Sequence, residues 1–161
     1  MVNDGAGLAS SGKTLRSVNL KEPLTVSPQL SVLEAARLMT AKNIDSVVVL
    51  GLSGTDDTPA GLRHPVLYGI VTVKDVTNRV TAKGLDPTKV TVSQVMTSPL
   101  QTVTLDTTLY KVVQLMNQNN FRQVPVVDQT KVVGMATSAI INASIINDIL
   151  EDIKLIATIF K

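Results

Sequence analysis

The residues best suited to chemistry lie where an apolar stretch, residues 66–71, runs into Thr72, Lys74 and Asp75. A helix starting after Thr72 would leave backbone N–H groups unpaired at its first turn, and such groups attract anions. Together with the Lys74 cation they suit a phosphoryl group, and the Asp75 carboxylate can accept from two hydroxyls of a neighbouring diol. The Thr-x-x-Asp spacing also fits a capping box, and from this stretch alone the cap is the favoured interpretation.

A second phosphate-binding pattern occurs at residues 7–14 (GLASSGKT), which match G-x-x-x-x-G-K-[ST]. That motif works only between a buried strand and a helix, where backbone N–H groups surround the phosphates. Residues 1–6 do not resemble a strand, and Pro23 interrupts any helix begun at Thr14. We interpret the match as coincidental and expect residues 1–13 to be a disordered leader.

The composition favours an intracellular globular protein. The 161 residues are 44% hydrophobic but only 2% aromatic, so Val, Ile, Leu, Met and Ala must form the core. No apolar run is long enough to span a bilayer, and the N-terminus lacks the apolar segment of a secretory signal. The sequence has no cysteine, which suits a reducing compartment, and we expect a cytoplasmic protein without a membrane role.

Several function classes find no support. The net charge is +2, without a dense basic stripe, and few aromatics are available for base stacking, which argues against nucleic-acid binding. The only histidine, His64, falls in a predicted loop, and no nucleophile is paired with a base. We therefore predict neither an enzyme nor a metal site.

The chain contains an internal repeat. At an offset of 77 residues, positions 25–51 align without a gap on 102–128, and apolar residues at helical spacing recur in both copies. Short apolar strands follow at 47–50 and 124–127. Gly69 matches Gly134 at an offset of 65, so the first repeat carries 77 − 65 = 12 extra residues, which we assign to a surface loop at 51–65.

Each repeat is predicted to run strand, helix, strand, strand, helix, which gives an α+β fold. We place repeat one at 14–88, repeat two at 89–147 and an amphipathic helix at 148–161. In repeat one, Ser31 and Glu34 predict a capping box at the start of the first helix. The last helix carries an apolar stripe suited to core packing or to a second subunit: Ile149, Leu150, Ile153, Ile156, Ala157 and Phe160.

The two repeats resemble a tandem pair of CBS domains, regulatory modules named after cystathionine β-synthase, like those of bacterial and fungal signalling proteins. The resemblance covers about residues 14–147. In repeat one it rests on residues 24–26 (LTV), 44–49 (IDSVVV) and 69–76 (GIVTVKDV), and in repeat two on 95–99 (VMTSP), 121–128 (FRQVPVVD) and 132–134 (VVG). It implies two βαββα units packed sheet to sheet with pseudo-two-fold symmetry, and two clefts for adenine nucleotides that both repeats build together.

One of these clefts is complete by this resemblance. Its expected residues are Thr72, Lys74, Asp75, Leu100, Gln101, Phe121, Arg122, Val124 and Pro125. The first three would hold phosphate and ribose, backbone groups of Leu100 and Gln101 would meet the base edge, and Phe121 would stack on the adenine. Arg122 could reach a phosphate. Core packing for Phe121 and a solvated charge for Arg122 are the alternatives, and Arg79 could pair with Asp75.

The other cleft departs from the family pattern. Thr137 matches Thr72, but Ile140 stands where Asp75 does, so the ribose-binding carboxylate is missing. Asp45 would add a negative charge near any phosphate. We expect this cleft to be empty or to bind something other than a nucleotide.

The resemblance implies a regulatory module that binds AMP, ADP, ATP or a related adenosyl ligand and requires no cofactor. A homodimer is expected, because CBS pairs commonly associate in twos, while the effector domain or protein is not indicated by the sequence. The alternative is a dimerisation or interaction module that binds no nucleotide.

Overall fold

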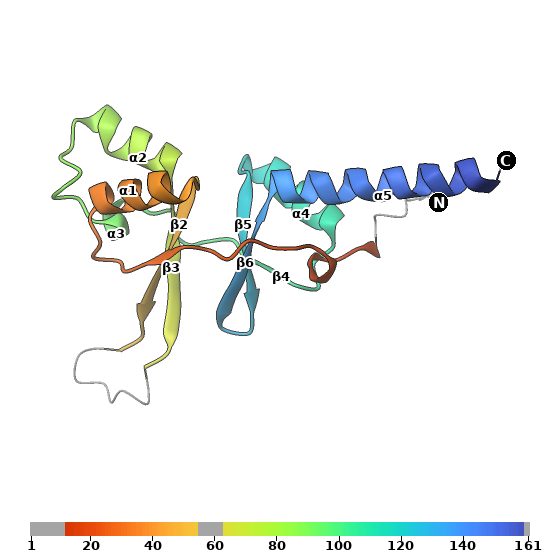
Figure 1. Cartoon of the computed structure of the whole chain (residues 1–161). Helices are drawn as coiled ribbons and strands as arrows, with labels where there is room; N and C mark the ends of the chain where they lie inside the picture. Colours follow the sequence, from red (N-terminus) through yellow and green to blue (C-terminus); the bar gives the residue numbers. More distant parts are fainter. Residues whose placement is uncertain (1–11, 55–62, 160–161) are drawn as a thin grey trace, which may run out of the picture. The chain divides into compact units, whose positions relative to one another are not determined.

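A computed structural model describes residues 12–54 and 63–159 of the chain (Figure 1). These residues fall into two compact units. The first-repeat unit contains Pro23–Gln101 together with Thr130–Val132, and the second-repeat unit contains the remainder. The phosphate-loop match lies largely outside the described residues, as do the leader up to residue 11 and the middle of the 51–65 loop.

The first-repeat unit is built on a three-stranded sheet of order β1-β2-β3. Its elements are β1 (Thr25–Val26), α1 (Val32–Lys42), β2 (Ser46–Leu52), β3 (Pro65–Thr72), α2 (Val73–Arg79), the 3-10 turn η4 (Thr81–Lys83) and α3 (Val92–Val95). Strand β1 pairs parallel to β2, and β2 pairs antiparallel to β3. Strands β2 and β3 extend into the segment 51–65, which the sequence predicted to be a loop: β2 continues to Leu52 and β3 begins at Pro65.

The second-repeat unit repeats this plan with the sheet order β4-β5-β6. Its elements are the 3-10 turn η2 (Leu15–Ser17), β4 (Val103–Thr104), α4 (Leu109–Asn119), β5 (Gln123–Asp128), β6 (Lys131–Thr137) from residue 133 onward, and α5 (Ser138–Ile159). The α+β class and the order strand, helix, strand, strand, helix are therefore confirmed in both units.

The predicted helical periodicity sets the core of each unit. Val32, Ala35 and Met39 of α1 are at most 2% exposed, and the aligned residues of α4 are at most 4% exposed. In α1 the Ser31 hydroxyl accepts from the Glu34 N–H at 3.2 Å, which confirms the predicted capping box. Burial of the matching stripe explains why the two helices form at equivalent positions.

The segment that leads into each repeat packs in the other unit. Val92 and Val95 of α3 fall within the range that the sequence assigned to repeat two, 89–147, but they belong to the core of the first-repeat unit. Leu15, which aligns with Val92 at the 77-residue offset, is fully buried in the core of the second-repeat unit. Residues 14–22, which the sequence assigned to repeat one, thus lie in the second-repeat unit. The apolar side chains of this segment pack in the core of the second-repeat unit.

Two matched glycines allow these exchanged segments to approach closely. A Cβ at Gly69 would stand 2.6 Å from the carbonyl oxygen of Thr97, beside the backbone hydrogen bonds between Thr97 and Ile70. A Cβ at Gly134 would stand 2.7 Å from the Cβ of Leu20. The glycine in each strand therefore leaves the space that the crossing segment occupies.

The C-terminal helix is longer than predicted. The sequence indicated a last helix within repeat two, 89–147, and a separate helix at 148–161, but α5 runs without interruption for 22 residues through Ile159. Neither glycine nor proline occurs within it, so no residue favours a break. Lys13 contacts its middle, where Nζ lies 2.6 Å from Oδ1 of Asp148.

Candidate functional site

The turn from β3 into α2 is a complete capping box. Thr72 is the N-cap residue, and its hydroxyl accepts from the Asp75 N–H at 3.2 Å. Asp75 Oδ2 accepts in return from the Thr72 N–H at 2.9 Å and from the Thr72 hydroxyl at 2.8 Å. The capping box that residues 72–75 predicted is confirmed, and it uses one of the two carboxylate oxygens of Asp75.

The second oxygen of Asp75 makes long contacts with the described residues around it. Oδ1 lies 3.3 Å from Nη2 of Arg79 and 3.5 Å from the Thr97 hydroxyl. The carboxylate is 12% exposed, so these contacts form near the protein interior. The alternative that Arg79 pairs with Asp75 is confirmed, although the distance exceeds the roughly 2.7–2.9 Å of a strong charge-assisted hydrogen bond.

Arg79 also joins α2 to the segment that follows α3. Its guanidinium donates to the backbone carbonyl of Val95 at 2.6 Å and to the Thr97 hydroxyl at 3.2 Å. Lys74, on the first turn of α2, is exposed. In the same unit, half-buried Leu100 and exposed Gln101 follow this segment and lead toward β4.

The remaining predicted site residues lie at the start of β5 in the second-repeat unit. Val124 and Pro125 are buried in the strand. Phe121 packs partly against the second core, and its N–H donates to the Met116 carbonyl at 3.1 Å. The Arg122 side chain is exposed, and its carbonyl accepts from the Ser138 N–H at 2.8 Å. This bond joins the start of β5 to the start of α5.

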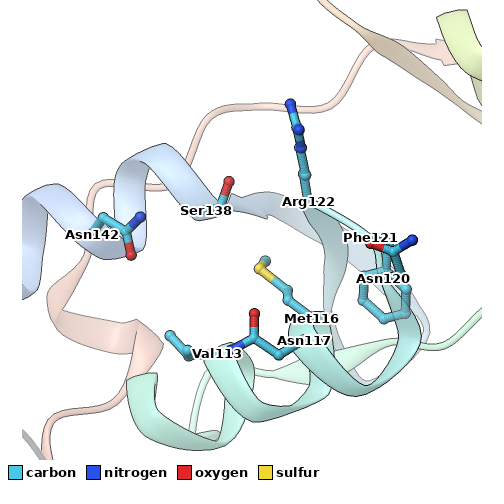
Figure 2. Close-up of a pocket in the computed structure, with 8 residues that line it drawn as sticks. All are labelled: Val113, Met116, Asn117, Asn120, Phe121, Arg122, Ser138 and Asn142. Carbon is cyan, nitrogen blue, oxygen red and sulfur yellow. The ribbon is translucent and has the colours of Figure 1, made fainter.

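A pocket of about 300 Å³ lies beside these two residues (Figure 2). Its lining comes from α4, the turn into β5 and α5: Val113, Met116, Asn117, Asn120, Phe121, Arg122, Ser138 and Asn142. Phe121 and Arg122 were predicted as ligand contacts, whereas the three asparagines and Ser138 were missed. Their identities follow no motif, and only the packing of α4 beside α5 brings them together. The volume is at the lower end for small-molecule sites.

The equivalent turn into α5 lacks an acid. The Thr137 hydroxyl accepts from the Ile140 N–H at 3.3 Å, and the first helical turn contains no acidic residue. In the first-repeat unit, Asp45 is exposed, and its carbonyl accepts from the Val73 N–H at 3.0 Å. That the second cleft holds no nucleotide stays a prediction.

Other chemistry finds little support in the part of the chain that the structure describes. Within residues 12–54 and 63–159, no three His, Cys, Asp or Glu side chains gather as a metal ion would require. None of the described helices has the length and hydropathy to cross a bilayer. Hydrogen bonds from Thr88 lower the pKa of Asp86, and a hydrogen bond from Arg16 lowers that of Asp106, both at exposed positions away from the turn.

Sequence comparison gives matches along most of the chain. The family model for the CBS domain matches residues 15–82 and 92–143. The CBS domain-containing protein CBSCBSPB2 of Arabidopsis thaliana is 35% identical over 123 residues, which are 76% of this chain and 21% of that protein. The chain thus spans about a fifth of that relative. YhcV of Bacillus subtilis is 34% identical over 111 residues, 69% of this chain and 70% of YhcV.

Structural comparison agrees. The CBS domain pair of protein MJ0100, solved in complex with 5′-methylthioadenosine and S-adenosyl-L-methionine, has a TM-score of 0.67 and 26% sequence identity to this chain. The match covers 84% of this chain and 98% of that one. Two family matches in sequence, two units of one plan and matching relatives lead to one conclusion: the chain belongs to the CBS domain family and carries two CBS domains in tandem.

Proposed function

We propose that this chain is a regulatory module that binds an adenine nucleotide, such as AMP, ADP or ATP, or a related adenosyl compound. Its proposed role is non-catalytic and requires no cofactor. The observation that carries the proposal is that the two oxygens of the Asp75 carboxylate make different contacts. One oxygen completes the helix cap, and the contacts of the other oxygen with the described residues are 3.3 and 3.5 Å long.

A cap and a ribose contact are compatible on one carboxylate. An ionised carboxylate has about four acceptor positions, and the cap uses two of them on Oδ2. The cap fixes the side chain before a ligand arrives, which lowers the entropy lost on binding. Oδ1 would then accept from a ribose hydroxyl in place of its long contact with Arg79.

The other proposed contacts follow the chemistry of an adenosyl ligand. Lys74 and the N–H groups at the start of α2 suit its phosphates or another anionic group. Phe121 offers a ring to the base, and Arg122 offers a cation. The proposed site also includes Leu100, Gln101, Val124 and Pro125. The adenosyl ligands in the MJ0100 structure support this ligand class.

Binding of the ligand would be coupled to a change in the arrangement of the two repeats, which an effector could detect. A ligand that contacts both repeats favours whichever arrangement it contacts better, and it can shift the equilibrium only by that difference in affinity. The proposal includes a homodimer and an effector in another domain or protein. It also includes a cytoplasmic location, which the cysteine-free sequence supports.

Calorimetric titration tests the proposal. Wild type and Asp75→Ala would be titrated with AMP, ATP and S-adenosyl-L-methionine. We expect wild type to bind at least one of them and Asp75→Ala to lose about tenfold or more in affinity, because ligand hydrogen bonds to charged groups contribute about 1.5–3 kcal/mol.

Glu34→Ala is the matched control, because it removes the capping-box acid of α1 in the same unit. It should bind like wild type, and equal losses in both variants would assign the effect to cap stability. Absence of binding by wild type to all three compounds would overturn the proposal.

An interaction module without nucleotide binding is the second candidate. The exposed aliphatic residues of α5 favour it, since they include Ile146, Ile149, Ile153 and Ile156 at 44–55% exposure. The two candidates are compatible, because the α5 residues lie outside the proposed ligand contacts.

A further inference from the structure

Arg79 lies where α2 meets the end of α3 and the segment that follows it. Its guanidinium donates to the Val95 carbonyl at 2.6 Å and to the Thr97 hydroxyl at 3.2 Å. Its third partner is Asp75, one turn earlier on α2, where Nη2 lies 3.3 Å from Oδ1. The Thr97 hydroxyl lies 3.5 Å from the same oxygen. One cation thus connects the carboxylate proposed to bind ribose with a separate segment of the chain.

The contacts of Arg79 differ in strength. The 2.6 Å bond to the Val95 carbonyl is short even for a charge-assisted hydrogen bond, whereas the contact with Asp75 is longer than such bonds usually are. Arg79 is therefore held mainly by the end of α3 and only weakly by the carboxylate. A hydroxyl that binds Oδ1 would replace the weak contact and leave the strong one in place.

The segment that Arg79 contacts carries two other proposed ligand contacts. Leu100 and Gln101 follow Thr97 by three and four residues, and backbone groups of both are proposed to meet the base edge. Backbone hydrogen bonds between Thr97 and Ile70, at 2.9 and 3.3 Å, pair the segment with β3, and β3 leads into the cap of α2. The distance between the base-edge contacts and the carboxylate therefore depends on how this segment is held.

The second-repeat unit has none of these three polar side chains. At the positions that match the carboxylate, the guanidinium and the hydroxyl, its residues are Ile140, Ser144 and Leu20. Leu20 packs against the second core, so the matching segment is attached there without a cation. Attachment of the segment alone thus does not require an arginine. The arginine occurs in the unit whose cap has the acid, which associates it with the carboxylate.

We propose that Arg79 is a positioning residue of the ligand site, which fixes the segment of Leu100 and Gln101 at the distance from Asp75 that an adenosyl ligand spans. This inference rests on the proposed function. The guanidinium suits the role, because its five donors lie in one rigid plane and can serve two acceptors at once. A ligand that uses both the carboxylate and the segment would then bind groups that are already in place, which lowers the entropy lost on binding.

Amide hydrogen exchange without ligand tests whether Arg79 holds the segment. In Arg79→Gln, the Thr97 and Ile70 amides should exchange about tenfold faster, because loss of a hydrogen bond to a charged group promotes local opening. The Met135 amide, which donates to the Lys21 carbonyl at the matched position of the second-repeat unit, should keep its rate. Unchanged exchange at Thr97 and Ile70 would overturn the inference.

Titration of the full chain with AMP, ATP and S-adenosyl-L-methionine tests whether this placement contributes to binding. Arg79→Gln should lose about tenfold in affinity, because the two groups are no longer held together before the ligand arrives. Arg37→Gln is the matched control, since it makes the same change of charge at an exposed position of α1 in the same unit. It should bind like wild type. Equal losses in both variants would assign the effect to charge alone and overturn the inference.

Two substitutions of Thr97 separate positioning from a structural role. Thr97→Val nearly keeps the shape but removes the hydroxyl that accepts from Arg79, so it should weaken binding in the same direction as Arg79→Gln. Thr97→Ser keeps the hydroxyl and should bind like wild type. If Arg79 only stabilises the last turn of α2 as a cation, Arg79→Gln will lower the melting temperature and Thr97→Val will bind like wild type. That result would overturn the inference.

The outcomes distinguish this inference from the proposed function. If wild type binds a compound and Arg79→Gln binds it equally well, the positioning role is wrong and the proposed function stands. If wild type binds none of the three compounds, the proposed function is wrong, and the positioning role in ligand binding is wrong with it.

Discussion

In each unit the helix that follows the third strand of the sheet begins at a matched threonine, Thr72 or Thr137, but the residues three positions later differ. Thr72 is followed by Asp75, whose carboxylate completes the cap and contacts Arg79. Thr137 is followed by Ile140, and its hydroxyl alone accepts from the Ile140 N–H at 3.3 Å. Since α5 begins without an acid and still runs for 22 residues, a carboxylate is not required to start this helix. This difference supports a role for Asp75 beyond capping.

The units also differ in how this helix continues. Arg79 ends α2 and donates to the carbonyl of Val95, and Gly84 then turns the chain with a φ of 64°. At the position matching Arg79, α5 has Ser144, and the helix continues past it. In the first-repeat unit, α2 is short and is held to the end of α3 by Arg79. In the second-repeat unit, the apolar helix α5 extends into solvent.

The largest expected effect compares matched core positions. Leu109 and Val32 align in the repeat, and both are fully buried. Leu109→Ala should lower the free energy of unfolding by about 2–5 kcal/mol. Val32→Ala should cost less, because it removes fewer carbon atoms. Urea unfolding of both variants measures the difference, and equal losses would contradict equivalent packing in the two units.

The matched glycines should give the next largest effect. Gly69→Ala would place a Cβ against the Thr97 backbone, while Gly134→Ala would place one against the Leu20 side chain. Overpacking of this kind costs about 1–3 kcal/mol, and the backbone contact should be the more costly because it disturbs a strand pairing. Thermal unfolding should show a lower melting temperature for Gly69→Ala than for Gly134→Ala. The opposite order would show that the backbone at Thr97 shifts to accept a Cβ more readily than the Leu20 side chain does.

Removing the N-cap hydroxyls of α2 and α5 should reduce stability by smaller amounts, which differ little between the two units. Thr72→Ala and Thr137→Ala should each lose about 0.5–2 kcal/mol of stability, the usual cost of an N-cap hydroxyl. Thr72→Ala should lose more, because it also removes the 2.8 Å hydrogen bond to Asp75. Chemical denaturation measures both, with Thr40→Ala, a hydroxyl within α1, as a non-capping control. Equal losses would show that the Asp75 contact adds no stability.

The smallest effect concerns pH. The hydrogen bond from Arg16 lowers the pKa of Asp106 in the folded state. A carboxyl whose folded pKa lies below its unfolded value stabilises the protein above the unfolded pKa, and this contribution disappears as pH falls through the folded one. The matching first-repeat positions are Ser93 and Gln29, which cannot form such a pair.

Arg16→Gln should therefore reduce stability slightly at pH 7 and leave it nearly unchanged at pH 2. The effect should be small, because both side chains are more than half exposed. Unfolding curves at the two pH values measure it, and a loss of equal size at both would exclude the ion pair as its cause.

The predictions from sequence succeeded where neighbouring residues determine structure. The predicted apolar face of α1 comprised Val32, Ala35, Ala36, Leu38 and Met39. Val32, Ala35 and Met39 are buried, while Ala36 and Leu38 are half-buried, and the recurrence of this spacing predicted the apolar face of α4. The Ser31–Glu34 and Thr72–Asp75 boxes were also readable, because a cap depends on residues three apart. The pocket beside Phe121 and Arg122 was only partly predicted, since Asn117 and Asn142 reach it from two different helices.

The sequence by itself determined the duplication, the class of fold and the chemical asymmetry between Asp75 and Ile140, because these depend on residue identity and local spacing. Only the tertiary structure decided which unit contains Leu15 and which contains Val92, since apolar segments of similar composition can be buried in either core. It also decided how the two oxygens of Asp75 are used. That assignment depends on where Arg79 and Thr97 are held by the packing around them.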